Sequence, residues 1–125
     1  MIVSLVQAED WVAEAIADLP AFLRQHIDNL DFQVRPWPTP AEKRAAGVPE
    51  NHDLLGLYRG IPLTQRTSGY NLVPPDIIFI FQGPIEAHTD GSPVAIRELI
   101  RHTVWHEIAH HFGISDDRLR ELGAY

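Results

Sequence analysis

The segment His106-Glu107-Ile108-Ala109-His110 has the residue types and the spacing of a metal-dependent hydrolase. Residues four apart lie on the same face of an α-helix, so the imidazoles of His106 and His110 can bind one metal ion. Glu107 lies about 100° around the helix from His106, within reach of a metal-bound water. Zinc held by neutral histidines lowers the pKa of that water toward ~7, and the carboxylate can take its proton. The motif therefore predicts metal-assisted hydrolysis, most often of a peptide bond, with Glu107 as general base.

A third metal ligand is expected, because catalytic zinc usually has three protein ligands and one open position. Gly113 is a suitable helix stop, and a turn there brings the following residues back toward the metal. Asp116 stands ten positions after His106, which is the offset of the last histidine in the metzincin pattern H-E-x-x-H-x-x-G-x-x-H, and a carboxylate is an acceptable zinc ligand. Asp117 is the competing ligand, but the spacing favours Asp116. Glu121 is a remote alternative, more than one helical turn away.

A long helix is predicted to position these side chains. Ser92 is a good N-cap, Pro93 a good first helical residue and Gly113 a good stop. The apolar residues between them cover one arc of the helical wheel: Ile100, Val104, Trp105, Ile108, Ala109 and Phe112. The remaining arc carries the histidine stripe and should face a cleft. We interpret His102 as a helix surface residue and His111 as a structural histidine.

The other elements indicate an α+β domain. Residues 9–27 have an amphipathic helical pattern that Pro20 interrupts by a kink or by starting a second helix. Strands are predicted around residues 32–34, 54–58 and 77–81, and the last, a continuous apolar run, should be central and covered on both faces. Residues 36–40 form a stiff proline-rich connector, residues 43–44 a solvated helical turn and residues 60–69 a loop. Ser115 is predicted to cap a short final helix.

Composition limits the remaining possibilities. The 125 residues, 45% of them hydrophobic, fit a single domain over 1–125 with one modest core. With no cysteine, disulfides and thiolate metal sites are excluded, which leaves histidine and carboxylate ligands. The net charge of −7 argues against nucleic acid as a partner. No apolar run has the length of a membrane span and no targeting segment is recognised, so a cytoplasmic protein without a membrane partner is expected.

The chain resembles the minimal zincin-like metallopeptidases of bacteria, which carry the motif H-E-x-x-H-x-x-G-x-x-D. The likeness rests on residues 55–60 with 62–64, on 75–76 and 83–84, and above all on 106–122. It implies a small three-stranded mixed sheet packed against the active-site helix. It further implies Zn²⁺ held by His106, His110 and Asp116, with Glu107 as the base of a zinc metallopeptidase. The implied substrate is a peptide or protein that pairs with an edge strand.

Two alternatives to a peptidase stay open at the level of sequence. One is a zinc- or peptide-binding module without turnover, because family likeness does not establish catalysis. The other is a different zinc-dependent hydrolase such as a ribonuclease, although a bacterial ribonuclease family with a related histidine helix lacks a glutamate at the position of Glu107. The group that stabilises the oxyanion is also open, with Tyr58, Tyr70, His88 and Tyr125 as candidates.

Overall fold

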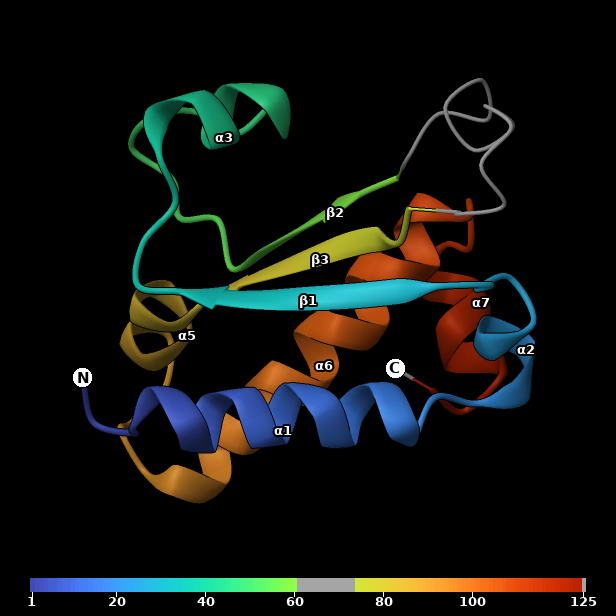
Figure 1. The fold of residues 1–125 in the computed structure, drawn as a ribbon, viewed down its shortest axis with the longest axis horizontal. Helices are drawn as coiled ribbons and strands as arrows, with labels where there is room; N and C mark the ends of the chain where they lie inside the picture. Colours follow the sequence, from blue (N-terminus) through green and yellow to red (C-terminus); the bar gives the residue numbers. More distant parts are fainter. Residues whose placement is uncertain (61–73, 125) are drawn as a thin grey trace.

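A three-stranded mixed sheet forms the centre of the computed structural model, which describes residues 1–60 and 74–124. Its strands are β1 (Leu30–Arg35), β2 (Gly56–Arg59) and β3 (Asp76–Phe81), in the order β1-β3-β2 (Figure 1). β1 runs parallel to β3, with Phe32 opposite Ile78, and β2 runs antiparallel to it, with Tyr58 opposite Ile78. The predicted α+β class and the mixed sheet are thus confirmed.

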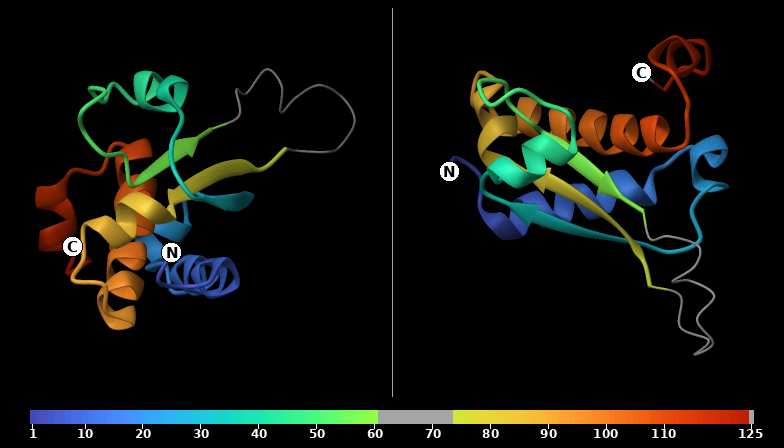
Figure 2. Two further views of the ribbon diagram at one scale, coloured as in Figure 1. Left: turned by 90° about the vertical axis from the view of Figure 1, so that its left-hand side faces the viewer. Right: turned by 90° about the horizontal axis from the view of Figure 1, so that it is seen from above.

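The central strand β3 is buried on both faces, as its unbroken apolar sequence predicts. Ile78 and Ile80 point into the main core, which helices cover, while Phe79 and Phe81 point to the opposite face. There they pack with Leu54 in a smaller cluster that the segment before β2 covers. The sheet therefore has a thick helical layer on one face and a thin cover on the other (Figure 2).

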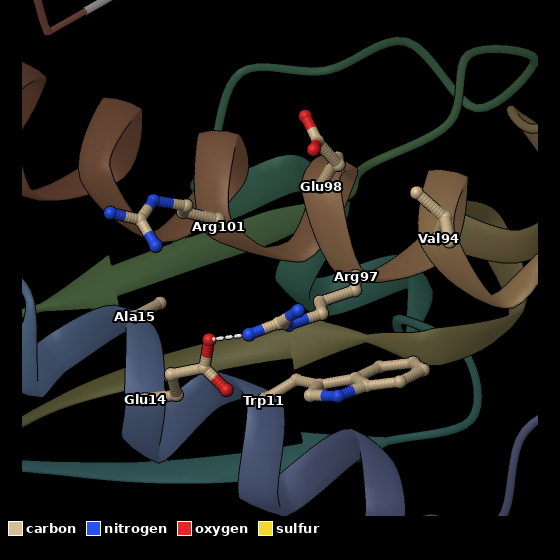
Figure 3. A pocket seen from close by; sticks show the side chains of 7 residues that line it. All are labelled: Trp11, Glu14, Ala15, Val94, Arg97, Glu98 and Arg101. Carbon is tan, nitrogen blue, oxygen red and sulfur yellow. Dashed lines mark hydrogen bonds and ion pairs between the residues drawn. The ribbon is translucent and has the colours of Figure 1, made fainter.

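Two long helices, α1 (Leu5–Ala17) and α6 (Pro93–His111), lie side by side under the same face of the sheet (Figures 1 and 2). α6 begins as predicted, since the Ser92 hydroxyl accepts the backbone N–H of Ala95 at 3.2 Å. Along their contact, Arg97 pairs with Glu14 (Figure 3). In the described ranges, no helix is both long and apolar enough to cross a membrane.

Four shorter helices complete the described fold: α2 (Ala21–Arg24), α3 (Pro40–Ala45), α5 (Gln82–Ala87) and α7 (Asp116–Glu121). Pro20 starts a second helix, as one of the two predicted outcomes, and the turn predicted at residues 43–44 belongs to α3. The sequence does not predict α5, because glycine followed by proline is typical of a turn. Proline is tolerated in the first turn of a helix, and the Glu86 carboxylate stabilises α5 against the N-terminal segment by accepting backbone N–H groups. Most of the loop predicted at residues 60–69 lies outside the described residues.

β2 and α6 approach each other most closely at Gly56. A Cβ atom there would lie 2.9 Å from Cγ2 of Thr103 and 3.1 Å from the carbonyl oxygen of Phe79. We expect Gly56→Ala to lower the free energy of unfolding by about 1–3 kcal/mol, because the strand or the helix must move to make room. Urea denaturation followed by circular dichroism measures the loss.

Gly60→Ala is the matched control for this substitution. A Cβ atom at Gly60 would approach only the exposed imidazole of His111 closely, and that side chain can turn away. The expected loss is therefore about 0.5 kcal/mol or less. Equal losses for the two alanine variants would contradict the close contact at Gly56.

Candidate metal centre

Two adjacent stripes of α6 side chains form the site. Thr103, Glu107 and His111 face β2, because a Cβ atom at Gly56 would meet Thr103 and Glu107 and one at Gly60 would meet His111. The second stripe, His102-His106-His110, lies beside the first and is partly or fully exposed. The arc predicted to be apolar does face the core, with Ile100, Val104, Ile108 and Ala109 fully buried and Trp105 and Phe112 partly so.

His106, His110 and Asp116 converge on one point, and each offers one ligand atom within 4.8 Å of the others. The two imidazole rings are 3.9 Å apart between centroids. Oδ1 of Asp116 lies 2.7 Å from Nε2 of His106 and 2.9 Å from Nε2 of His110. Two imidazole nitrogens and a carboxylate oxygen are a common ligand set of catalytic zinc, which leaves one position open. The donor chemistry and the convergence of the three side chains therefore fit a zinc ion.

A glycine turn brings Asp116 to the two histidines. Gly113 has φ +77°, and the backbone N–H of Ile114 donates to the carbonyl of Ala109 at 2.8 Å, which ends α6 in a left-handed turn. Ser115 then caps α7, accepting the backbone N–H of Arg118 at 3.2 Å. Asp116 is the first residue of α7, as the cap predicted at Ser115 requires.

The two alternative third ligands lie elsewhere. The Asp117 side chain is 90% exposed, and its carboxylate pairs with Arg120 at 3.2 Å. The Glu121 carboxylate pairs with Arg118 at 2.9 Å. Neither belongs to the group of converging ligand atoms found among the described residues. Within the described residues, the carboxylate that lies beside the two histidines is that of Asp116.

The electrostatics of the cluster favour a neutral His106 and an ionised Asp116. Burial and the neighbouring His110 lower the pKa of His106 below that of an ordinary histidine, although Asp116 opposes the shift. The pKa of Asp116 is lowered, first by its hydrogen bond with His110 and further by His106. A neutral imidazole beside an ionised carboxylate can bind a metal with little competition from protons.

Glu107 has the opposite environment. Burial raises the pKa of its carboxyl group, while His110 and a hydrogen bond from the backbone N–H of Tyr58 limit the rise. The carboxylate is therefore held against the edge of β2, next to the histidine cluster but outside it. A carboxylate with a raised pKa is a stronger base than an exposed one.

Two of the four side chains considered for stabilising the oxyanion, Tyr58 and His88, lie within the described residues. Tyr58 donates its hydroxyl to Oδ2 of the buried Asp76 at 2.6 Å, and its ring stacks on His111 with centroids 4.0 Å apart. Nε2 of His88 lies 2.8 Å from Oδ2 of Asp53. Tyr70 and Tyr125 lie outside the described residues.

Asp76 and the backbone of Tyr58 were not recognised from sequence. The carboxylate of Asp76 accepts the Tyr58 hydroxyl, and the same tyrosine supplies the N–H that holds Glu107. An acid at the first position of an apolar strand was the available signal, since a buried aspartate normally has a partner. No pattern in the sequence indicated that the Tyr58 N–H would contact Glu107.

A mixed α+β fold in which a helix presents two histidines and a neighbouring glutamate defines the zincin class of domain. A family model described as zincin-like metallopeptidase matches residues 27–124, and the chain belongs to this family. A comparison with curated proteins gave no significant match.

The turn at Gly113 gives a prediction that separates stability from site geometry. No atom lies within 4 Å of a Cβ built at Gly113, so Gly113→Ala should cost about 1 kcal/mol of folding free energy from backbone strain alone. The altered turn should also displace Asp116 and weaken zinc binding about tenfold or more. Thermal denaturation and titration against a chromophoric chelator measure the two effects.

Gly123→Ala is the matched control for the turn. Gly123 has φ +73° and equally open surroundings, but it follows the far end of α7. A similar loss of stability with unchanged zinc affinity is expected. If both variants lose zinc affinity alike, the Gly113 turn has no special role in placing the carboxylate.

Proposed function

We propose that this protein is a zinc-dependent peptidase in which His106, His110 and Asp116 hold the metal and Glu107 is the general base. The observation that carries the proposal is the convergence of the three ligand atoms within 4.8 Å across the α6–α7 turn. Membership of the zincin-like metallopeptidase family supports the same reaction class. The position of Glu107, one residue from a proposed ligand and held by a strand edge, supports its role as base.

Each residue of the site has a separate task in the proposed reaction. A bound zinc ion would supply a Lewis acid that lowers the pKa of water and polarises the substrate carbonyl. Glu107 would take the proton of the attacking water and deliver it to the leaving amine. The Tyr58 N–H fixes the direction of that carboxylate, and Asp76 in turn holds the tyrosine side chain. The base is thus oriented before the substrate arrives.

The outer edge of β2 is the proposed binding surface for the peptide backbone. The carbonyl of Leu55 accepts the N–H of Phe81 at 2.9 Å, so by the alternation of an antiparallel pair the backbone groups of Gly56 and Tyr58 face away from β3. The Tyr58 N–H contacts Glu107, so the carbonyl of Tyr58 and the backbone groups of Gly56 are the ones proposed to pair with a peptide. This edge borders the stripe that contains Glu107. An extended peptide that pairs with β2 would therefore pass the base and the metal ligands.

Replacement of the proposed carboxylate ligand should weaken zinc binding. Asp116→Ala removes one of three ligands and is expected to reduce the zinc affinity at least about tenfold to a hundredfold. Asp117→Ala removes the same charge one residue away and should change the affinity less than about twofold, because that carboxylate points to Arg120. Competition with a chromophoric chelator at neutral pH measures both constants. If Asp117→Ala lowers the zinc affinity more than Asp116→Ala does, the third ligand is Asp117 instead of Asp116.

Removal of the proposed base should abolish cleavage without releasing the metal. Glu107→Gln is expected to lower kcat by more than about 100-fold while zinc content stays the same. The assay follows quenched fluorescent peptides with zinc-loaded protein, and elemental analysis gives the zinc content. Glu121→Gln is the control, since it neutralises an exposed carboxylate that pairs with Arg118.

Two outcomes of this experiment would contradict the proposal in different ways. Equal cleavage by wild type and Glu107→Gln would refute the base. Absence of cleavage by the zinc-loaded wild type across a broad peptide set would refute the peptidase and leave the binding module.

A further inference from the structure

An open hollow of about 590 Å³ lies beside the N-terminal half of α6. Residues between positions 88 and 102 line it, and His102 is the member nearest the proposed metal centre. The ring of His102 stacks on that of His106, with centroids 5.5 Å apart. The hollow is therefore continuous with the histidine stripe and extends the site toward the start of α6.

The lining combines apolar and acidic groups. Leu99, Ala95 and Val94 contribute apolar surface, and Glu98 and Asp90 contribute carboxylates. The residues that line the hollow within the described part of the chain include neither lysine nor arginine. A cation with an apolar stem fits such a surface, since the stem contacts the apolar groups while the charge meets the carboxylates.

Glu98 lines a neighbouring pocket together with Arg97 and Arg101 of its own helix, but its charged group points in another direction. Figure 3 shows its carboxylate turned away from the guanidinium groups of Arg97 and Arg101, which face the side of α1. Those arginines pair with Glu14 and Asp18 of the α1 region instead. The negative charge of Glu98 is therefore directed away from the neutralised face of α6.

Asp90, which also lines the hollow, keeps its negative charge. Its side chain accepts the backbone N–H of Ser92 at 2.9 Å, and hydrogen bonding with Ser92 holds the pKa of the carboxyl group below its usual value. His88 also lines the hollow, and its Nε2 lies 2.8 Å from the carboxylate of Asp53. Asp53 precedes β2 by three residues, so the hollow and the start of the substrate-binding edge lie at the same end of the site.

We propose that this hollow is a substrate subsite that binds a lysine or arginine side chain through Glu98 and Asp90. The inference rests on the proposed peptidase function and adds a preference for basic substrates to it. The net charge of the whole chain, −7, supports a subsite for basic residues, because a negatively charged protein attracts cationic peptides.

The geometry also limits the position of the basic residue. Glu98 precedes His106 by eight residues, which corresponds to about 12 Å along the helix axis. An extended peptide advances about 3.3 Å per residue, and a long basic side chain shortens the distance that the backbone must cover. The lysine or arginine is therefore expected about two to four residues from the scissile bond.

A binding experiment with zinc-loaded, full-length Glu107→Gln protein tests the subsite without turnover. The probes are fluorescent alanine-based heptapeptides that carry lysine, norleucine or glutamate at one position. We expect lysine to bind about fivefold or more tighter than norleucine, with glutamate weakest, and the preference to shrink in 1 M salt. Adding Glu98→Gln, alone or with Asp90→Asn, should bring the lysine peptide close to the norleucine peptide. Adding Asp10→Asn, which removes an exposed charge on α1 outside the lining, should leave the preference intact.

Cleavage of the same peptides by the zinc-loaded protein with Glu107 intact gives the second measurement. A lysine preference in kcat/KM at one fixed distance from the cleaved bond, lost with Glu98→Gln, would support the subsite. Cleavage without any lysine preference, or a preference that Glu98→Gln and Asp90→Asn leave unchanged, would overturn the subsite while the peptidase stands. Binding that depends on Glu98 in a protein that never cleaves would refute the peptidase and retain the subsite.

Discussion

The close contact between β2 and α6 is the constraint on which the site depends. Gly56 lacks a side chain, so the strand lies directly against Thr103 and Glu107. The Tyr58 N–H can then reach the Glu107 carboxylate. Once Glu107 faces the strand, the helical period turns the histidine stripe outward beside it. One packing contact thus sets the direction of both the proposed base and the two imidazoles.

Two carboxylates of the site have environments that shift their pKa values in opposite directions. Burial against β2 raises the pKa of Glu107, whereas hydrogen bonding with His110 and His106 lowers that of Asp116. A raised pKa suits a carboxylate that must accept a proton, as proposed for Glu107. A lowered pKa suits a carboxylate that must stay ionised beside a cation, as proposed for Asp116. The division of roles between the two acids therefore follows from where the chain places them.

α6 serves a different purpose on each of its faces. Its apolar arc is buried in the main core, and its arginines join it to the α1 region through Glu14 and Asp18. The remaining arc carries Glu107 and the histidines, with Glu98 further toward the N-terminus. Because the ion pairs with α1 neutralise one side only, the side that faces the hollow keeps its negative charge. The same helix thus anchors the fold and gives the site its charge.

The sequence by itself determined the local features: the bounds of α6, the short helix after Ser115, the buried central strand and the spacing that singles out His106, Glu107, His110 and Asp116. These features depend on neighbours along the chain, through caps, helical period and turn residues. Only the tertiary structure decided the order β1-β3-β2, the helical form of residues 82–87, and the partners of Tyr58 and Glu86. Each of these depends on contacts between segments far apart in sequence, such as Glu86 with the N-terminal backbone or Tyr58 with Asp76. A pattern confined to one segment carries no information about which distant segment packs against it.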